Sequence, residues 1–216
     1  YGQPLIMPVD ESHTCVPVTI KGKIAWMLEQ ALSDFEQVYG LSWIALRCFT
    51  VAGAVPENDV GELHFPEIHE IPLVMRQLLL RHQQNEIQEA APLVMAQTHD
   101  YVHVHDVALA CLRALQYLES HIEQCGTMSM AINIGSGKPT SWQTIAQAVY
   151  ELFGYQFGNI QAPESVGVIG TPLVANITRA RLTLEWQPQV SQLSFILQSA
   201  LAWERRALLM MRTKSM

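Results

Sequence analysis

Histidine and aspartate side chains lie close together in one short segment, where their types and spacing could bind a metal ion. His103 and His105 stand two residues apart, and side chains at that spacing share one face of a β-strand. Imidazole nitrogens and carboxylate oxygens are common zinc ligands, so these residues could form a metal site together with His99 and Asp106. In the alternative, Asp106 caps a helix that begins at Val107, and the histidines pack as ordinary strand residues.

Glycine and cysteine residues mark two further places where chemistry could occur. Gly135-Ser136-Gly137 is too short for the glycine-rich fingerprint that holds a dinucleotide phosphate at a helix end, so it predicts a turn. The four cysteines are widely scattered and match no paired metal or redox spacing, which favours reduced thiols in the cytoplasm. Cys48 is expected to be a small core residue.

The balance of charged and apolar residues excludes several classes of protein. Asp and Glu outnumber Lys and Arg by 20 to 13, so the formal net charge is -7 and no cationic field would gather nucleic acid or an anionic membrane surface. With 216 residues, 49% of them hydrophobic, the chain can bury one large core or slightly more. No apolar run approaches the roughly 20 residues of a membrane span. We therefore expect a globular cytoplasmic protein with no nucleic-acid or membrane partner.

Strands and helices are predicted to alternate along the chain, which is typical of an α/β fold. Apolar residues at steps of three and four predict a helix over residues 23–38, ended by Gly40. Residues 41–49 are apolar almost throughout, which predicts a strand buried on both faces. Ser141 is placed to cap a helix that Gly154 ends. Further helices are expected after Pro72, from Val107 to about Glu119 and over residues 193–208, and further strands at Tyr101–Val104 and Ala131–Ile134.

Six short segments carry motifs that point to one family when they are taken in order. They are Tyr1-Gly2-Gln3-Pro4, Leu46–Ala54, Gly61–Pro72, His99–Ala110, Ala131–Gly137 and Leu184–Pro188. Together they resemble the UDP-glucose 4-epimerases, which are extended short-chain dehydrogenases. The resemblance runs from end to end and corresponds to roughly the C-terminal two thirds of a family member.

The resemblance implies an α/β fold with a partial doubly wound, Rossmann-like parallel sheet that lacks its N-terminal strands, plus the smaller C-terminal sugar-nucleotide-binding subdomain. We expect residues 1–60 to be the remaining part of the Rossmann-like domain. Residues 61–216 are expected to form the mixed substrate subdomain, with returning Rossmann elements at about 99–120. Without those N-terminal strands, the strand near residues 43–49 would expose an unpaired edge, which invites a partner or further residues of the same chain.

The resemblance also bears on the cofactor and on one histidine. In the family, NAD is held by a glycine-rich turn in the N-terminal half, and this sequence carries no such turn. We therefore expect no cofactor as the sequence stands, and NAD if an N-terminal half exists and is intact. The resemblance implies in addition that His103 is an ordinary packed histidine.

The family's catalytic positions hold different residues here. The resemblance implies a Tyr that takes the proton of the sugar hydroxyl, and a Lys four residues later that lowers the pKa of that Tyr. Aligned through the helix that follows, these positions fall on Lys21 and Ala25. A second register uses Lys23 as the Lys and Thr19 in place of the Tyr, but it needs a two-residue insertion. Neither register restores the pair, so we predict no catalytic residues.

Four residues are candidates for residual binding of a UDP-sugar: Thr50, His69, His99 and Ser165. The resemblance implies that Thr50 replaces an Asn, and that His99 and Ser165 each replace an Arg. Losing an Arg removes charge-assisted bonds to a diphosphate, which are about twice as strong as neutral ones. His69 and His64 lie in a segment that the family uses near the uridine, so they are either ligands or parts of a structural loop.

Apolar packing positions are thus kept, whereas charged ligands are replaced. This pattern favours a non-catalytic UDP-glucose 4-epimerase-like protein that acts as a protein-interaction or scaffold module, with a protein partner or as a homo-oligomer. The alternative is the C-terminal part of an active NAD-dependent UDP-glucose/UDP-galactose 4-epimerase or a related sugar-nucleotide enzyme. Binding of UDP-glucose would favour the alternative.

Overall fold

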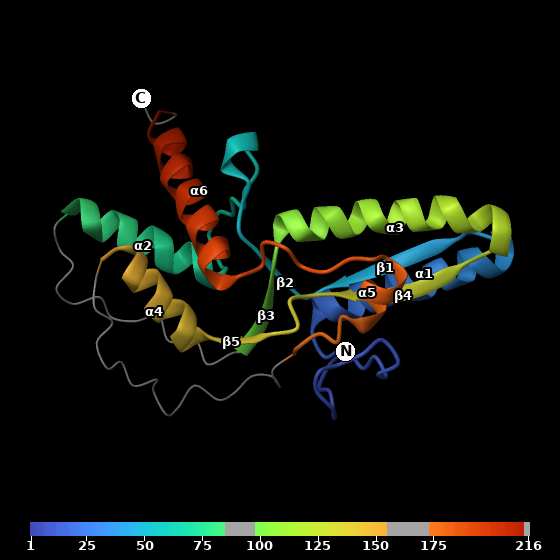
Figure 1. Cartoon of the computed structure of the whole chain (residues 1–216). Coiled ribbons are helices and arrows are strands. Elements are labelled where there is room, and N and C mark those ends of the chain that lie inside the picture. The colour runs from blue at the N-terminus through green and yellow to red at the C-terminus, as the bar shows by residue number, and fades with distance from the viewer. Residues whose placement is uncertain (85–97, 155–172, 214–216) are drawn as a thin grey trace.

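Strands alternate with helices along the chain, as Figure 1 shows for a computed structural model that describes residues 1–84, 98–154 and 173–213. The helices are α1 (Ile20–Tyr39), α2 (Glu70–Gln84), α3 (Val104–Cys125), α4 (Trp142–Leu152), α5 (Thr178–Thr183) and α6 (Leu193–Thr213), with a short 3₁₀ turn, η1 (Pro56–Asn58). The strands are β1 (Trp43–Cys48), β2 (Thr50–Ala52), β3 (Thr98–His103), β4 (Ser129–Ile134) and β5 (Pro139–Ser141). The predicted α/β class is confirmed.

Two small sheets organise the described residues. β1 and β4 run parallel over six residues, from Trp43 opposite Ser129 to Cys48 opposite Ile134. β2 pairs in parallel with β3, and β3 pairs antiparallel with β5. The parallel pairs match the expected Rossmann-like portion of a doubly wound sheet, since such pairs need long crossover connections.

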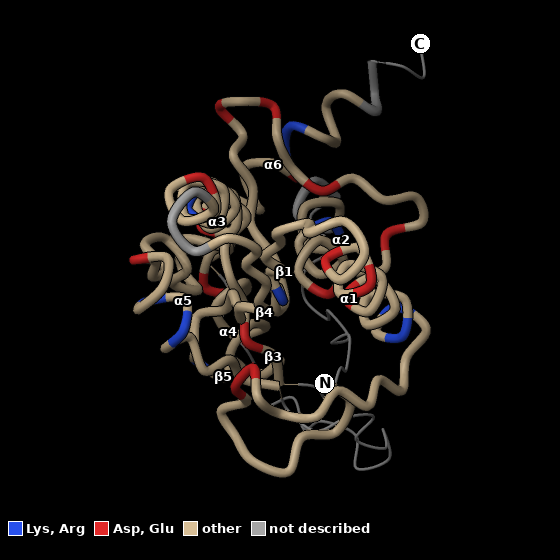
Figure 2. The backbone as a smooth tube through the Cα atoms, turned by 90° about the vertical axis from the view of Figure 1, so that its right-hand side faces the viewer, with Lys and Arg blue, Asp and Glu red and all other residues tan. Residues whose placement is uncertain are grey.

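One core lies around the parallel pair of strands. Figure 2 shows β1 and β4 between α1 on one side and α3 with α5 on the other. The buried side chains of this core come from β3, α3, β4, α5 and the segment after α5. They are Val102, Ala110, Ala114, Ile132, Ile134, Ala180, Leu184 and Trp186. The side of the strands that carries α1 contributes no buried residue from that helix.

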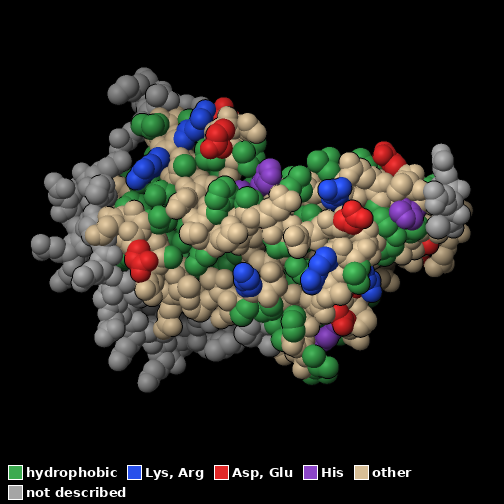
Figure 3. All heavy atoms as spheres, in the orientation of Figure 1, with side chains coloured by type: hydrophobic (Ala, Val, Ile, Leu, Met, Phe, Trp, Pro, Cys, Tyr) green, Lys and Arg blue, Asp and Glu red, His purple; other side chains and the backbone are tan. Residues whose placement is uncertain are grey.

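A second core joins the three helices at the other end of the molecule, where α2, α4 and α6 lie together (Figure 1). It contains Met75 and Leu78 of α2, Ile145 and Val149 of α4, and Ile196 of α6, all almost completely buried. On the face drawn in Figure 3, Lys and Arg side chains lie singly among apolar and polar atoms, several of them beside Asp or Glu.

Local sequence signals fix several ends of these elements. Gly40 ends α1 in the left-handed conformation, with φ 67°, and its N–H donates to Glu36 O at 2.8 Å. The Ser141 hydroxyl accepts a hydrogen bond from Thr144 N at 3.2 Å and caps α4. The predictions for these two helices are confirmed. No helix of the described residues is long and apolar enough to cross a membrane.

The prediction that β1 is buried on both faces is wrong. Its residues are only half-buried, and Cys48 is exposed instead of lying in a core. Among the described strands, β1 pairs with β4 alone, so its other edge is open. The face toward α1 borders a cavity, and this explains the exposure.

The predicted capping role of Asp106 is also wrong. α3 begins at Val104, two residues before Asp106, and its cap is His103, whose Nδ1 accepts from His105 N at 3.0 Å. The fully buried Asp106 carboxylate instead accepts hydrogen bonds from residues 189–191, at 2.5–3.0 Å. It therefore ties the start of α3 to the segment before α6.

Candidate functional site

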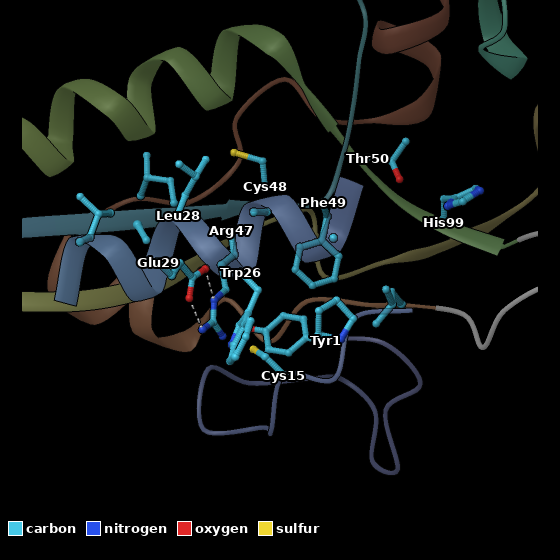
Figure 4. Close-up of a pocket in the computed structure, with 17 residues that line it drawn as sticks. Tyr1, Cys15, Trp26, Leu28, Glu29, Arg47, Cys48, Phe49, Thr50 and His99 are labelled. Atoms are coloured by element: carbon cyan, nitrogen blue, oxygen red, sulfur yellow. Dashed lines mark hydrogen bonds and ion pairs between the residues drawn. The ribbon is translucent and has the colours of Figure 1, made fainter. Parts of the chain in front are cut away.

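A cavity of about 600 Å³ opens between α1 and the carboxyl end of β1, as Figure 4 shows. Tyr1 and Cys15 close one side, and Trp26 and Leu28 of α1 form another. The rest of the wall is formed by Cys48, Phe49, Thr50 and His99. Carboxyl ends of parallel strands are where α/β sheets bind ligands, so this cavity is the candidate functional site.

Arg47 and Glu29 form the charged wall of the cavity. Arg47 Nε donates to Glu29 Oε1 at 2.9 Å, and Arg47 Nη2 donates to Glu29 Oε2 at 2.7 Å, which joins β1 to α1 (Figure 4). The guanidinium carbon also lies 4.9 Å from the centre of the Tyr1 ring. The positive charge is therefore already balanced by a carboxylate of the same protein.

Neither Tyr1 nor Cys48 carries the deprotonated group that a base or a nucleophile needs. Burial raises the pKa of the Tyr1 hydroxyl, which donates a hydrogen bond to Asn133 Oδ1 at 2.5 Å. Water reaches part of the Cys48 side chain, yet the protein atoms around it raise the pKa of this thiol to about 11, with nearby Cys111 adding to the effect. Both groups stay protonated near neutral pH.

The two positions that the sequence aligned with a catalytic pair lie on the first turns of α1. Ala25 borders the cavity, where a methyl group offers no proton and no charge. Lys21, one turn earlier, is exposed and does not line the cavity. The position nearest the cavity is therefore chemically inert.

Two predicted binding residues meet in this cavity. Thr50 begins β2 opposite Tyr101 of β3, and His99 lies two residues before Tyr101, so both side chains reach the same wall. His99 Nε2 lies 3.8 Å from Glu70 Oε1, and the Tyr101 hydroxyl donates to Glu70 Oε2 at 2.8 Å. Thr50 and His99 remain candidates for contact with a ligand.

The other two predicted binding residues are not in the cavity. His69 lies in the loop before α2, beside Glu62 and His64, and lines none of the cavity wall. Ser165 lies outside the described residues. The structure thus brings together two of the four candidates.

The Gly135-Ser136-Gly137 segment is a turn built around a carboxylate. The buried Asp100 accepts hydrogen bonds from Ser136 N at 2.6 Å and from Gly137 N at 2.9 Å. It also accepts from Ser136 Oγ at 2.6 Å and from Ala175 N at 2.9 Å. These amides are occupied and Arg47 is paired, so neither the turn nor this arginine is free to hold a dinucleotide pyrophosphate.

His103 is a packed residue, as expected. It is 1% exposed, its Nε2 lies 3.0 Å from Ser199 Oγ, and its backbone N–H donates to Ser191 Oγ at 2.8 Å. Gly53 lies against the ring, where an added Cβ would come within 2.6 Å of Nε2, so no room remains for a ligand on that side.

Sequence reasoning missed Arg47, Glu29 and Tyr1 as cavity residues. A signal existed, because Arg47 stands inside an otherwise apolar strand, and a charge in such a place needs a partner. The identity of that partner, on a helix 18 residues earlier, is a tertiary fact that no local pattern reveals.

Comparison with known proteins gives consistent results. The model of the NAD dependent epimerase/dehydratase family matches residues 21–135. A UDP-glucose 4-epimerase of Rhizobium meliloti (strain 1021) is 37% identical over 208 residues, which are 95% of this chain and 61% of that protein. A UDP-glucose 4-epimerase of Lacticaseibacillus casei is 32% identical over 205 residues, 94% of this chain and 60% of that protein.

Solved structures agree with the fold. The crystal structure of UDP-glucose 4-epimerase from Brucella ovis in complex with NAD has a TM-score of 0.73 and 26% identity, over 93% of this chain and 61% of that chain. Another crystal structure of UDP-glucose 4-epimerase has a TM-score of 0.80 and 27% identity, over 95% and 61%. The chain thus spans about 60% of the length of the relatives that it matches.

Proposed function

Because the chain belongs to the NAD dependent epimerase/dehydratase family, we propose that it is a non-catalytic UDP-glucose 4-epimerase-like protein that acts as a protein-interaction module. The observation that carries the proposal is Ala25 at the cavity wall, with Lys21 exposed to solvent outside it. In the resemblance described above, Lys21 stands at the position of the proton-transferring Tyr and Ala25 at the position of its Lys. An alanine and a solvated lysine cannot replace that pair.

Three other groups of the cavity, Arg47, Tyr1 and Cys48, do not supply a substitute. Arg47 is neutralised by Glu29, and the Tyr1 and Cys48 protons are held by the raised pKa values of their groups. A base that removes a sugar hydroxyl proton works best with a pKa near the operating pH. These three groups fall outside that range or are already paired.

An exposed apolar surface supports the interaction role. None of the residues of α1 is buried, and its apolar side chains include Ile24, Met27, Phe35 and Val38, which are exposed by 50% to 71%. The neighbouring edge of β1 has no strand partner among the described residues. A contiguous apolar helix face beside an open strand edge is typical of a surface that another polypeptide covers.

The occupant that fits this surface is a polypeptide that adds a parallel strand to β1 and packs apolar side chains on α1. Additional strands of the same fold, in the same or another polypeptide, have this chemistry, and the matched relatives are longer than this chain. The proposed contact therefore combines strand addition with burial of α1.

Enzyme assay and binding measurements test the proposal. The protein, with any native residues that precede Tyr1 included, is incubated with UDP-galactose and NAD, and the appearance of UDP-glucose is followed. We expect no turnover above the rate without protein. Interconversion of the two nucleotides would contradict the proposal.

A second candidate function is favoured by one observation, the meeting of Thr50 and His99 in the cavity. In this reading the chain is the sugar-nucleotide-binding part of a longer, active UDP-hexose 4-epimerase. Calorimetric titration with UDP-glucose separates the two. Micromolar binding that Thr50→Ala and His99→Ala both weaken supports the second candidate, whereas absence of binding supports the first.

A further inference from the structure

Four metal-ligating side chains converge in the loop that precedes α2. Each side chain offers one ligand atom, and these atoms all lie within 4.8 Å of one another. The four residues are Glu62, His64, Glu67 and His69. We propose that this loop is a binding site for a divalent transition-metal ion, zinc by its ligand chemistry. The site lies apart from the cavity described above and does not depend on the proposed function.

The ligand atoms of the cluster lie close enough together to share one ion. Glu62 Oε1 lies 3.0 Å from His64 Nδ1 and is also paired with His69 Nδ1. His69 Nδ1 lies 3.5 Å from Glu67 Oε1. In a tetrahedral zinc site with bonds of about 2.0–2.1 Å, neighbouring ligand atoms stand about 3.3–3.4 Å apart. An ion would therefore replace the direct contacts between Glu62 and the two histidines, whose ligand atoms would move apart to this spacing.

Charge around Glu67 favours a cation. Its side chain is only 3% exposed, and its Oε1 accepts hydrogen bonds from Ile68 N and His69 N, both at 3.0 Å. Its Oε2 is buried and makes no hydrogen bond. The arginine beside it is Arg76, whose Nη2 lies 3.5 Å from Glu67 Oε2.

Arg76 is committed to a different carboxylate. It donates from Nε to Glu204 Oε2 at 3.0 Å and from Nη2 to Glu204 Oε1 at 3.1 Å. One guanidinium therefore faces two carboxylates, those of Glu67 and Glu204, and balances one of their two negative charges. A bound divalent ion would balance the buried charge of Glu67 together with that of the part-exposed Glu62.

The loop is held in place from α6. The Trp203 indole N–H donates to Glu62 O at 2.6 Å, and Gly61 lies flat against the same ring, where an added Cβ would come within 2.1 Å of Trp203 Cδ2. This support fixes the backbone at the first ligand. Such fixation of ligands by neighbouring groups is what keeps a metal site selective.

The ligand set indicates which ion binds. Two imidazoles with two carboxylates match zinc, whereas magnesium and calcium prefer oxygen ligands alone. The His64 and His69 side chains are about half exposed, at 51% and 46%, so the ion can enter from solvent. With four protein ligands the ion would be structural, and it would remove His69 Nδ1 from any contact with a sugar nucleotide.

Calorimetric titration of the chelator-treated chain with zinc chloride tests the site. We expect one equivalent to bind with micromolar or tighter affinity, and Tm to rise by several degrees at saturating zinc. X-ray absorption should show two imidazoles in a four-coordinate shell with bonds of about 2.0–2.1 Å. Magnesium chloride at the same concentration should leave Tm unchanged.

Variants make the assignment specific. His64→Gln and His69→Gln should each weaken zinc binding at least tenfold, while His105→Gln, which changes an exposed histidine of α3, should not. Both cluster histidines are exposed enough for the variants to fold, which circular dichroism checks. Millimolar or weaker zinc binding, or binding that the cluster variants leave unchanged, would overturn the proposal.

Discussion

Arg76 of α2 and Glu204 of α6 form a two-point ion pair across the helical end of the molecule, with donor–acceptor distances of 3.0 Å and 3.1 Å. The Glu204 side chain is 1% exposed. The hydrogen bonds to Glu204 raise the pKa of Arg76, against the opposing effect of burial. The pair therefore fixes how these two helices pack.

Arg76→Ala is expected to lower the free energy of unfolding by about 3 kcal/mol, because it leaves the Glu204 carboxylate buried without its cation. Urea denaturation measures the loss. Arg113→Ala, which removes an exposed arginine of α3, serves as the matched control and should change stability by less than about 0.5 kcal/mol. Equal effects of the two variants would show that the pair is not stabilising.

Asp100→Asn should be strongly destabilising although it keeps the size of the side chain. The carboxylate accepts four hydrogen bonds, from Ser136, Gly137 and Ala175, and an amide nitrogen cannot accept those that reach it. We expect a loss of about 2–3 kcal/mol in urea denaturation. Asp34→Asn, on the exposed surface of α1, should leave the midpoint unchanged.

Local sequence patterns predict some elements of the fold and not others. The helix at α1 and its end at Gly40 follow from local periodicity and from a glycine that adopts positive φ, so the sequence predicts both. The role of Asp106 is different, because its partners lie 83 to 85 residues away and outcompete the local helix cap. α5 has only six residues, which is too short for a periodic signal.

The candidate site shows the same division. Thr50 and His99 are named as ligand candidates by the resemblance, but their place on one wall follows from the pairing of β2 with β3, which the sequence did not predict. The pairing of Arg47 with Glu29 depends on how α1 crosses β1, which no local pattern specifies. The spacing of Glu62, His64, Glu67 and His69 was readable in the sequence, but only their convergence in space distinguishes four ligands from an ordinary polar loop.

Stability should depend on pH through His103. Burial lowers the pKa of this imidazole below its usual value of 6.5, with nearby Asp106 opposing the shift. The unfolded chain therefore binds a proton at a higher pH than the folded chain does. The contribution of His103 is fully present above pH 6.5 and is lost as pH falls toward the lower, folded-state pKa.

Urea denaturation of the wild type and of His103→Gln at pH 7.5 and pH 5.5 measures this dependence. The wild type should lose more stability than the variant across this range, by at most about 1.4 kcal/mol per pH unit. Parallel losses in both proteins would mean that other groups cause the pH dependence.

Met27→Glu should reduce association through α1. Met27 is 64% exposed in the middle of the apolar surface, so a carboxylate there would have to be desolvated on contact with a partner or a second copy. Sedimentation velocity should show a smaller associated fraction than for the wild type. Gln30→Glu, an equally charged change at an exposed polar position of the same helix, is the control and should have a smaller effect.

The hydrogen bonds from α6 to α2 and to the loop before it affect the order in which the protein can fold during synthesis. Trp203 donates a hydrogen bond to Glu62, 141 positions earlier in the chain, and Glu204 accepts one from Arg76, 128 positions earlier. During translation, neither anchor exists until α6 has emerged from the ribosome. The helical end of the molecule is therefore completed only after α6 has been made, and a nascent chain stalled before residue 203 would leave this loop without its support.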